Sequence, residues 1–325
     1  LNTIVGSFSG DALEGGSRNA VLGYNCLSAE DGHGYNVAIG YEALKVQNAE
    51  ANAYNVAIGY ETGTALTSGD QNILVGGFAG HDITTSQDNT AIGYNALAKE
   101  TIRSRSVAIG YEALNLQTGA DEDPYNVAVG YQAGTGVTSG KFNVLMGAEA
   151  GEALATGSYN VAIGHQALMT EDQYGKNTAI GYQALRLLDS GSDGQNTAIG
   201  YQAGKDVTSG ISNVLIGSTT GDALQGGTSN VAVGNFALSA EDGHGNNTAI
   251  GTYALQDLNA DTNANDTAVG YFAGGNCTTS VQSVYIGAFA GFACTSASDN
   301  VAIGYQALKA ETVRGKSVAI GKDAL

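Results

Sequence analysis

The chain has 325 residues, with 31 acidic and 13 basic side chains, a formal net charge of −18, 48 glycines and one proline. This charge excludes nucleic acid as an expected partner, because such proteins need Lys and Arg to displace counterions from phosphate. The hydrophobic content of 43% excludes a disordered glycine-rich chain. No apolar run approaches the roughly 20 residues of a membrane-spanning helix, so membrane insertion is not expected.

A nine-residue motif recurs from one end of the chain to the other. It reads NVAIGYEAL from Asn36, NTAIGYNAL from Asn89, NVAVGYQAG from Asn126 and NVAIGYQAL from Asn300. Nineteen copies can be aligned, most of them 17 residues apart. The first position is Asn in fifteen copies, and the fifth is Gly in all nineteen. Such self-similarity at a short period predicts a repeat architecture.

Each copy is expected to form one short strand. Positions 2 to 4 are small or β-branched and apolar, and turn residues follow the motif, which is typical of a strand. Seventeen residues cannot hold a strand and a crossover helix, whose connection alone needs about a dozen residues. The chain is therefore predicted to be all-β, a parallel β-solenoid or β-roll of about nineteen 17-residue coils. Equivalent residues, including the Asn of position 1, would stack in ladders about 4.8 Å apart.

A longer period of four coils lies over the first. Position 9 is Leu in one type of coil and Gly in the other, and the Gly type has an apolar residue at position 12 instead. The types alternate in pairs, which predicts a single continuous domain, 1–325, built from superrepeats of 70 or 71 residues. These superrepeats are 36–105, 106–176, 177–246 and 247–316. Each type of coil thus has one large apolar side chain, at position 9 or at position 12, so the apolar volume inside the coil stays similar, as a close-packed interior requires.

One coil in four combines a large residue at position 3 with a small one at position 6. Leu74 occurs with Gly77, and Leu145 with Ala148, where other coils mostly have Ala and Tyr. We interpret this pairing as a sign that the side chains of positions 3 and 6 compete for the same space. The Gly of position 5 would form a bulge that turns both positions to the same side.

The strands also bear on assembly. In a lone solenoid one face of each strand points inward and the other meets water, but here positions 2, 3 and 4 are all apolar. Packing of position 3, such as Ala38 or Ala179, against a partner favours a homotrimer around its inner strands. A monomeric solenoid with coils of about 34 residues stays open, because a period does not fix the coil size.

The SVAIG-type strands, the G-x-x-A spacing and the polar turn resemble the head repeats of trimeric autotransporter adhesins, which form left-handed parallel β-rolls. Runs such as NTAIGYQAL at 177–185 are also similar to repeats in bacteriophage tail-fibre proteins. The resemblance covers essentially the whole chain and implies a trimeric extracellular fibre. The chain departs from adhesin heads in its longer repeat, its recurring Tyr and its four-coil superperiod, so the viral and bacterial alternatives both stay open.

Three cysteines are candidates for thiol chemistry. Cys277 and Cys294 lie one repeat apart at position 12, where other Gly-type coils have Leu, Ile or Val. We interpret them as two buried thiols stacked in the core, with a disulfide as the alternative. Cys26 replaces the Ala of position 8 and is expected to pack.

Three of the four histidines are candidates for metal binding, since imidazole is a ligand of transition metals. His165 takes a Tyr position, and three copies of it could meet at a trimer axis. His33 and His244 lie in matching SAEDGHG turns, which lack the regular oxygen spacing of a calcium loop. A packed ring and two solvated turns are the favoured interpretations, and no metal or cofactor is expected.

Four turns carry two or three extra residues, at 45–54, 115–125, 186–195 and 256–265. In a solenoid such insertions lie along one edge, which is often the binding edge. Their acidic residues include Asp121, Glu122, Asp123, Asp189, Asp193, Asp257 and Asp261. A host-surface receptor, a glycan or divalent ions are the candidate partners of this edge. Solvated turns that keep a fibre soluble are the favoured interpretation.

No enzyme signature is present, because the sequence lacks a G-x-S-x-G elbow, a P-loop and a Cys–His cluster at metal spacing. The expected function is structural and adhesive, in the shaft or head of an extracellular fibre on a virion or a cell surface. A bacteriophage tail fibre for host attachment is favoured, and a bacterial trimeric surface adhesin is the first alternative. The second alternative is a monomeric solenoid whose flat Ala/Gly/Thr face binds ice or polysaccharide.

Overall fold

The computed structural model describes residues 1–102, 104–118, 122–310, 312 and 315–324. These residues contain nineteen short parallel strands and no helix, so the predicted all-β solenoid is confirmed. No helix long and apolar enough to cross a membrane occurs in this part of the chain. Two compact units can be distinguished, Leu1–Asn160 and Val161–Leu325.

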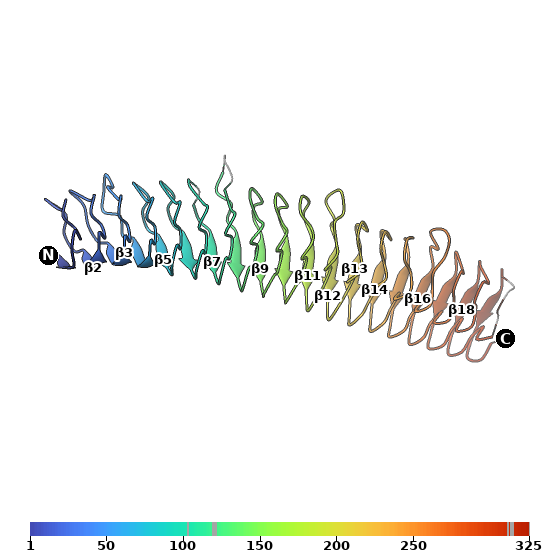
Figure 1. Cartoon of the computed structure of the whole chain (residues 1–325). Helices are drawn as coiled ribbons and strands as arrows, with labels where there is room; N and C mark the ends of the chain where they lie inside the picture. Colours follow the sequence, from blue (N-terminus) through green and yellow to red (C-terminus); the bar gives the residue numbers. More distant parts are fainter. Residues whose placement is uncertain (103, 119–121, 311, 313–314, 325) are drawn as a thin grey trace. The chain divides into compact units, whose positions relative to one another are not determined.

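The first unit has one strand for each turn of its coil (Figure 1). Its strands are β1 (Thr3–Val5), β2 (Ala20–Tyr24), β3 (Val37–Tyr41), β4 (Val56–Tyr60), β5 (Ile73–Val75), β6 (Thr90–Ile92), β7 (Val107–Ile109), β8 (Val127–Val129) and β9 (Val144–Met146). Within this unit each strand from β1 to β8 pairs in register with the next one along the chain, so that Ala57 lies opposite Leu74 and Leu74 opposite Ala91.

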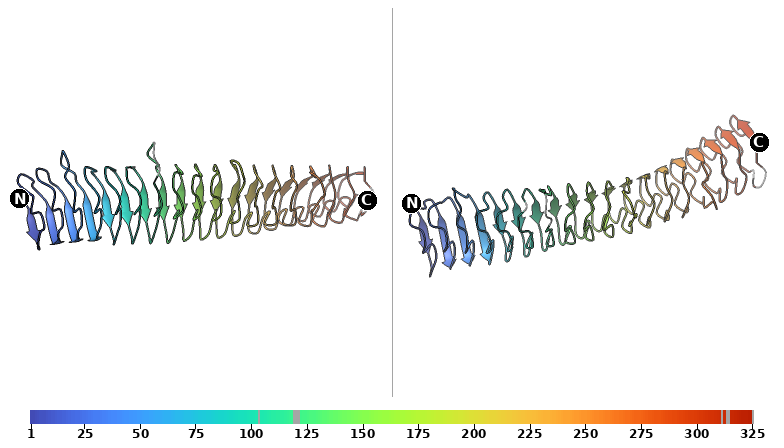
Figure 2. Two further views of the ribbon diagram at one scale, coloured as in Figure 1. Left: turned by 45° about the horizontal axis from the view of Figure 1, so that its top comes forward. Right: turned by 90° about the horizontal axis from the view of Figure 1, so that it is seen from above.

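The second unit repeats this arrangement. Its strands are β10 (Val161–Ile163), β11 (Thr178–Ile180), β12 (Thr197–Ile199), β13 (Val214–Ile216), β14 (Val231–Val233), β15 (Thr248–Ile250), β16 (Thr267–Val269), β17 (Val284–Ile286), β18 (Val301–Ile303) and β19 (Val318–Ile320). Ala162 lies opposite Ala179, 17 residues further on. Figure 2 shows that the strands of each unit line one side of its coil. A coil therefore holds one repeat, and the alternative of 34-residue coils is wrong.

The Asn of position 1 forms the predicted ladder inside the coil. The backbone N–H of Asn72 donates to Oδ1 of Asn55 at 2.8 Å, and that of Asn89 donates to Oδ1 of Asn72 at 3.1 Å. The Asn72 amide also donates from Nδ2 to the carbonyl oxygen of Ser86 at 2.8 Å. Each of these side chains thus joins neighbouring coils and satisfies buried backbone groups that would otherwise be costly.

The side chains of position 3 point into the coil, and those of position 6 point away from it. Ala38 and Ala179 are fully buried within their own chain, whereas Tyr41 is 40% exposed. The expectation that position 3 packs against a partner is therefore wrong. The expected bulge is also wrong, because it would have placed positions 3 and 6 on the same side.

The Gly of position 5 allows a close approach of neighbouring backbones. Gly76 has a φ of 129°, and a Cβ atom there would lie 2.5 Å from the carbonyl oxygen of Gly93 in the next coil. Both the torsion angle and the lack of space exclude other residues. This explains why Gly occurs in every copy.

A large side chain at position 3 competes with position 9 rather than with position 6. The side chain of Leu74 extends between the two glycines of position 9 in its own and the preceding coil. A Cβ atom on Gly63 would lie 2.8 Å from Cδ1 of Leu74. Leu145, Leu215 and Tyr285 contact the position 9 glycines of their coils in the same way.

Candidate functional site

The inserted turns are the most distinctive surface of the coil. Figure 1 shows the turns at 45–54, 186–195 and 256–265 projecting beyond neighbouring turns, on the edge away from the strands. The turn at 115–125 is described only in part, and Asp121 lies outside the described residues. Within the second unit, both inserted turns lie on the same edge, as the solenoid pattern predicts.

A buried glutamate lies in the coil before each inserted turn. These residues are Glu30, Glu100, Glu171 and Glu241, and all four are fully buried. The sequence analysis expected solvated turns at Glu30 and Glu241, and for these two carboxylates that expectation is wrong. The carboxylate of Glu30 accepts the backbone N–H of His33 at 3.0 Å and that of Ala49, in the inserted turn, at 3.3 Å. It therefore ties its own turn to the inserted turn of the next coil.

The counterpart Glu171 has the same role in the second unit. One of its oxygens accepts the backbone N–H of Tyr174 at 3.1 Å, and the other accepts the hydroxyl of Ser190 at 3.0 Å. Burial raises the pKa of Glu171 above its usual range, although these hydrogen bonds oppose the shift. The inserted turns are thus anchored from beneath by carboxylates that water does not reach.

Several acids that were predicted at the binding edge pair with neighbouring coils instead. Glu122 accepts from Lys141 at 3.0 Å. Asp123 accepts the backbone N–H of Ser104 at 3.1 Å and forms an ion pair with Arg105. These contacts hold the described part of the inserted turn against the coils beside it.

The predicted acids of the second unit do not form one site. Asp193 pairs with Lys176 at 2.5 Å, and this bond lowers the pKa of the aspartate. Asp189 lies with Glu171 and Asp172 in a cluster whose carboxylate oxygens are within 4.8 Å of one another. Asp257 and Asp261 are exposed. Asp193 and Asp189 therefore contact residues of the preceding coil, whereas Asp257 and Asp261 are solvated.

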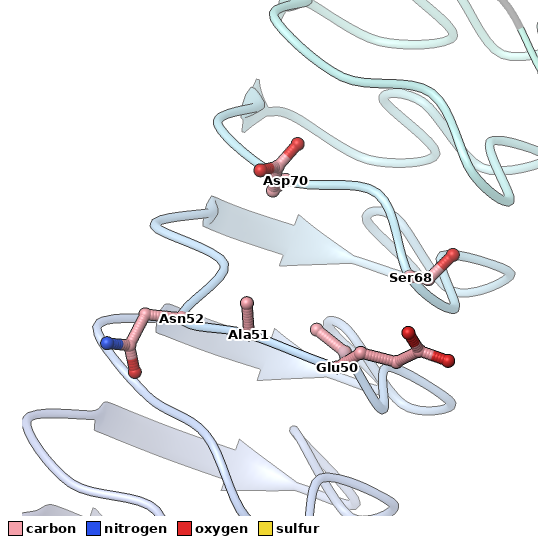
Figure 3. A pocket seen from close by; sticks show the side chains of 6 residues that line it. Glu50, Ala51, Asn52, Ser68 and Asp70 are labelled. Atoms are coloured by element: carbon pink, nitrogen blue, oxygen red, sulfur yellow. The ribbon is translucent and has the colours of Figure 1, made fainter.

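A shallow cleft adjoins the first inserted turn. Figure 3 shows Glu50, Ala51 and Asn52 of this turn beside Ser68 and Asp70 of the next coil. The cleft has a volume of about 320 Å³ and is open to solvent. Its two carboxylates and its small size suit a cation or a short polar ligand rather than an apolar one.

The three candidate histidines occupy two kinds of environment. His165 is exposed and stacks on Tyr182, with ring centroids 5.5 Å apart. The imidazole of His33 lies 3.8 Å from the Glu30 carboxylate, and that of His244 lies 3.6 Å from Glu241. The matching turns therefore place each imidazole against a buried acid, whereas His165 continues a ring stack.

All three cysteines are buried free thiols. Cys277 and Cys294 point into the core and approach the carbonyl oxygens of the following coil, Gly291 at 3.4 Å and Leu308 at 3.5 Å. Burial raises the pKa of Cys277, which leaves its thiol protonated and unreactive. Cys26 similarly approaches the carbonyl oxygen of Gly40 at 3.0 Å.

The tyrosines of position 6 form stacked ladders on the surface. The rings of Tyr24, Tyr41 and Tyr60 lie 5.3 and 5.0 Å apart, with interplanar angles of 9°. Because each ring face covers the next, the ladder presents ring edges and hydroxyl groups to solvent. A sugar stacks on a free aromatic face, so these three rings are poorly placed for such binding.

An apolar surface runs along the outer face of the strands, formed by positions 2 and 4; we call it the outer strand face. Ile58 and Ile92 are each 37% exposed, and Ile73 is 44% exposed. In the second unit, Ile216 and Ile250 are 37% and 40% exposed. Contiguous apolar surface of this kind usually marks an interaction site.

No family model, curated protein or solved structure matches this chain.

Proposed function

We propose that the chain is a structural and adhesive part of an extracellular fibre, in which three copies pack together through the outer strand face. The fibre is proposed to be a bacteriophage tail fibre that attaches to a host-surface receptor or glycan. A noncatalytic role of this kind agrees with a surface built from repeated, evenly spaced side chains. The net charge of −18 would keep such a fibre soluble.

The exposure of the outer strand face carries this proposal. Ile58, Ile73 and Ile92 lie on three consecutive strands of the first unit, β4, β5 and β6, and each side chain is more than a third exposed. A second and a third copy would remove this row from water, at about 25 cal/mol for each Å² of apolar area buried. Position 3 cannot supply the contact, since Ala38 is fully enclosed.

The viral and bacterial versions of the fibre share this packing. The four-coil superperiod and the recurring Tyr of position 6, which adhesin heads lack, favour the bacteriophage fibre. A bacterial trimeric surface adhesin remains the alternative. The ice-binding or polysaccharide-binding monomer loses support, because the Ala side chains of its supposed flat face lie inside the coil.

Sedimentation equilibrium tests the assembly. One chain has a mass of 32.9 kDa, so a trimer has three times that mass, close to 99 kDa. We expect the larger value at micromolar concentration. A mass near that of one chain would overturn the proposed trimer, and the exposure of the apolar strand face would then have no explanation.

Binding of the labelled full chain to a panel of bacterial cells tests the adhesive role. A matched variant, Glu50→Gln with Asp257→Asn and Asp261→Asn, removes exposed charges from two inserted turns and leaves the buried glutamates in place. We expect this variant to bind cells as well as the parent, as solvated turns would. Loss of binding would instead make the inserted turns the binding edge, with affinity supplied by avidity.

A further inference from the structure

The ring of Phe78 interrupts the tyrosine ladder of the first unit. Position 6 of its coil is Gly77, which has no ring, and Phe78 at position 7 contacts both Tyr60 and Tyr94 instead. Its ring lies at 68° to Tyr60 and at 88° to Tyr94, with centroids 5.3 and 5.7 Å away. Neither tyrosine therefore lies flat on a face of Phe78, in contrast to the stacked ladder, where each ring covers the next.

A second shallow cleft opens beside this ring. Its lining comes from three successive coils of the first unit and consists of Phe78, His81, Asn95, Ala98, Lys99 and Asn115. The cleft has a volume of about 290 Å³ and is open to solvent. Pockets for small ligands begin at about 300 Å³, so this cleft suits a ligand with the size of one sugar ring.

Two amide side chains in the cleft have hydrogen-bonding groups that the described part of the chain does not use. The carboxamide of Asn95 makes no hydrogen bond with a described residue, whereas Asn25, at the same position of an earlier coil, donates to Oε1 of Glu42 at 3.2 Å. Asn115 donates from Nδ2 to the backbone carbonyl oxygen of Asn95 at 3.1 Å, and its Oδ1 accepts from no described residue. The cleft thus offers both donors and acceptors to a ligand.

The basic side chains of the cleft are paired with carboxylates. Lys99 donates to Oδ2 of Asp82 at 3.1 Å. Nδ1 of His81 lies 2.5 Å from Oδ1 of the same aspartate, and Nε2 of His81 lies 3.5 Å from Oε2 of Glu61. An anionic ligand would have to compete with these two carboxylates, so the charges favour an uncharged ligand.

We propose that this cleft binds one neutral pyranose ring of a host-surface glycan; the proposal rests on the adhesive function proposed above. The face of an aromatic ring carries partial negative charge, which attracts the weakly positive C–H groups on one side of a pyranose. The sugar hydroxyl groups would bond to the carboxamide of Asn95 and to Oδ1 of Asn115. Recognition would then lie beside Phe78, and the inserted turns would remain solvated.

Saturation-transfer NMR of the full chain tests the site, with the methyl pyranosides of glucose, galactose, mannose and N-acetylglucosamine as probes. We expect at least one of the four to bind with a Kd of about 1 mM, as a ligand of this size should. Phe78→Leu keeps an apolar side chain but removes the ring face, and it should weaken binding about three- to tenfold. Asn95→Ala should weaken binding by a similar factor, about three- to tenfold.

Phe289→Leu is the matched control. Phe289 also follows a small residue of position 6, Ala288, but its ring is stacked on Phe272 at 8°, and Nζ of Lys309 lies 5.8 Å from its centroid. Because its faces are covered, this variant should bind the pyranoside as the parent does. Equal losses in the two leucine variants, or tighter binding of methyl glucuronide than of methyl glucoside, would overturn the proposal.

Attachment of the labelled chain to cells separates this proposal from the adhesive function. If the parent attaches to cells but binds none of the four pyranosides, the proposed sugar site is wrong and the adhesive role stands. If the parent binds a pyranoside in a manner that depends on Phe78 but attaches to no cells, the site stands and the adhesive role is wrong. Asn95 is partly exposed and its side chain makes no bond to the described chain, so Asn95→Ala should fold even if Phe78→Leu does not.

Discussion

The side chain of Leu74 occupies the space that a side chain at Gly80 would need. A Cβ atom on Gly80 would lie 2.8 Å from Cδ2 of Leu74. Backbone torsion does not require glycine there, because φ is 57° at Gly80 and 51° at Leu97, the same position in the next coil. Gly at position 9 is therefore a matter of space, and the four-coil superperiod follows from this packing.

Leu74→Ala should destabilise the first unit by about 2–5 kcal/mol, because it leaves a cavity between Gly63 and Gly80. Gly80→Ala should cost about 1–3 kcal/mol through overpacking against Leu74 and Ile83. Thermal melting followed by circular dichroism measures both effects. The two costs arise from the same contact, so they should not be additive.

The double variant Leu74→Ala with Gly80→Leu tests the exchange of volume directly. It copies the combination found at Ala179, Leu185 and Leu188 in another coil, all of which are fully buried. We expect it to melt at a higher temperature than Leu74→Ala alone. A lower melting temperature would show that positions 3 and 9 do not share space.

Asp266 interrupts the Asn ladder with a buried acid. Its Oδ1 accepts the backbone N–H of Ser283 at 2.7 Å, and its Oδ2 accepts the hydroxyl of Ser280 at 2.7 Å. These bonds do not offset burial, which raises the pKa of Asp266 to about 6. The folded chain thus holds a proton on this group at a pH where the unfolded chain, with a pKa of about 3.9, has lost it.

Asp266→Asn should stabilise the second unit at pH 7.5 and have little effect at pH 4. Since the folded pKa is the higher one, stability is lost as pH rises from about 4 to about 6. A shift of about two pKa units corresponds to about 3 kcal/mol. Melting temperatures in the presence of EDTA, which keeps metal ions away, measure the difference. An equal difference at both pH values would contradict the assigned titration.

Much of the fold could be predicted from the sequence because the repeat itself is short. Asn at position 1 and Gly at position 5 recur with every coil, which determines the period, the parallel register and the ladder. The inward face of the strand could not be determined in the same way. Positions 2, 3 and 4 are all apolar, so the alternation that normally distinguishes the two faces is absent.

The buried glutamates could not be recognised from residue type, because a glutamate in a polar turn is normally solvated. Their spacing did contain a signal. Glu30, Glu100, Glu171 and Glu241 are 70 or 71 residues apart, and each precedes an inserted turn. A charged residue that recurs at the superperiod at position 12, where most Gly-type coils have Leu, Ile or Val, is better interpreted as part of the interior.

Ile58→Lys combined with Ile92→Lys should prevent assembly through the outer strand face. Each side chain is 37% exposed in the single chain, so the lysines can reach water there, whereas a trimer interface would bury their charges. Sedimentation should show the mass of one chain. The control is Val46→Lys, which changes an inserted-turn residue that is 38% exposed and should leave the trimer intact. A trimer that persists in the double variant would place the interface elsewhere.

Glu30→Gln should loosen the inserted turn 45–54, whereas Glu50→Gln should not. Both changes remove one negative charge, but Glu30 is fully buried and accepts two backbone N–H groups, while Glu50 is exposed. A glutamine side chain has one oxygen, so its NH₂ group must face a donor and one bond is lost, at a cost of about 1–3 kcal/mol. Hydrogen exchange at the Ala49 amide should therefore quicken about tenfold or more in Glu30→Gln alone. Equal exchange in the two variants would show that the inserted turn holds its shape without the buried carboxylate.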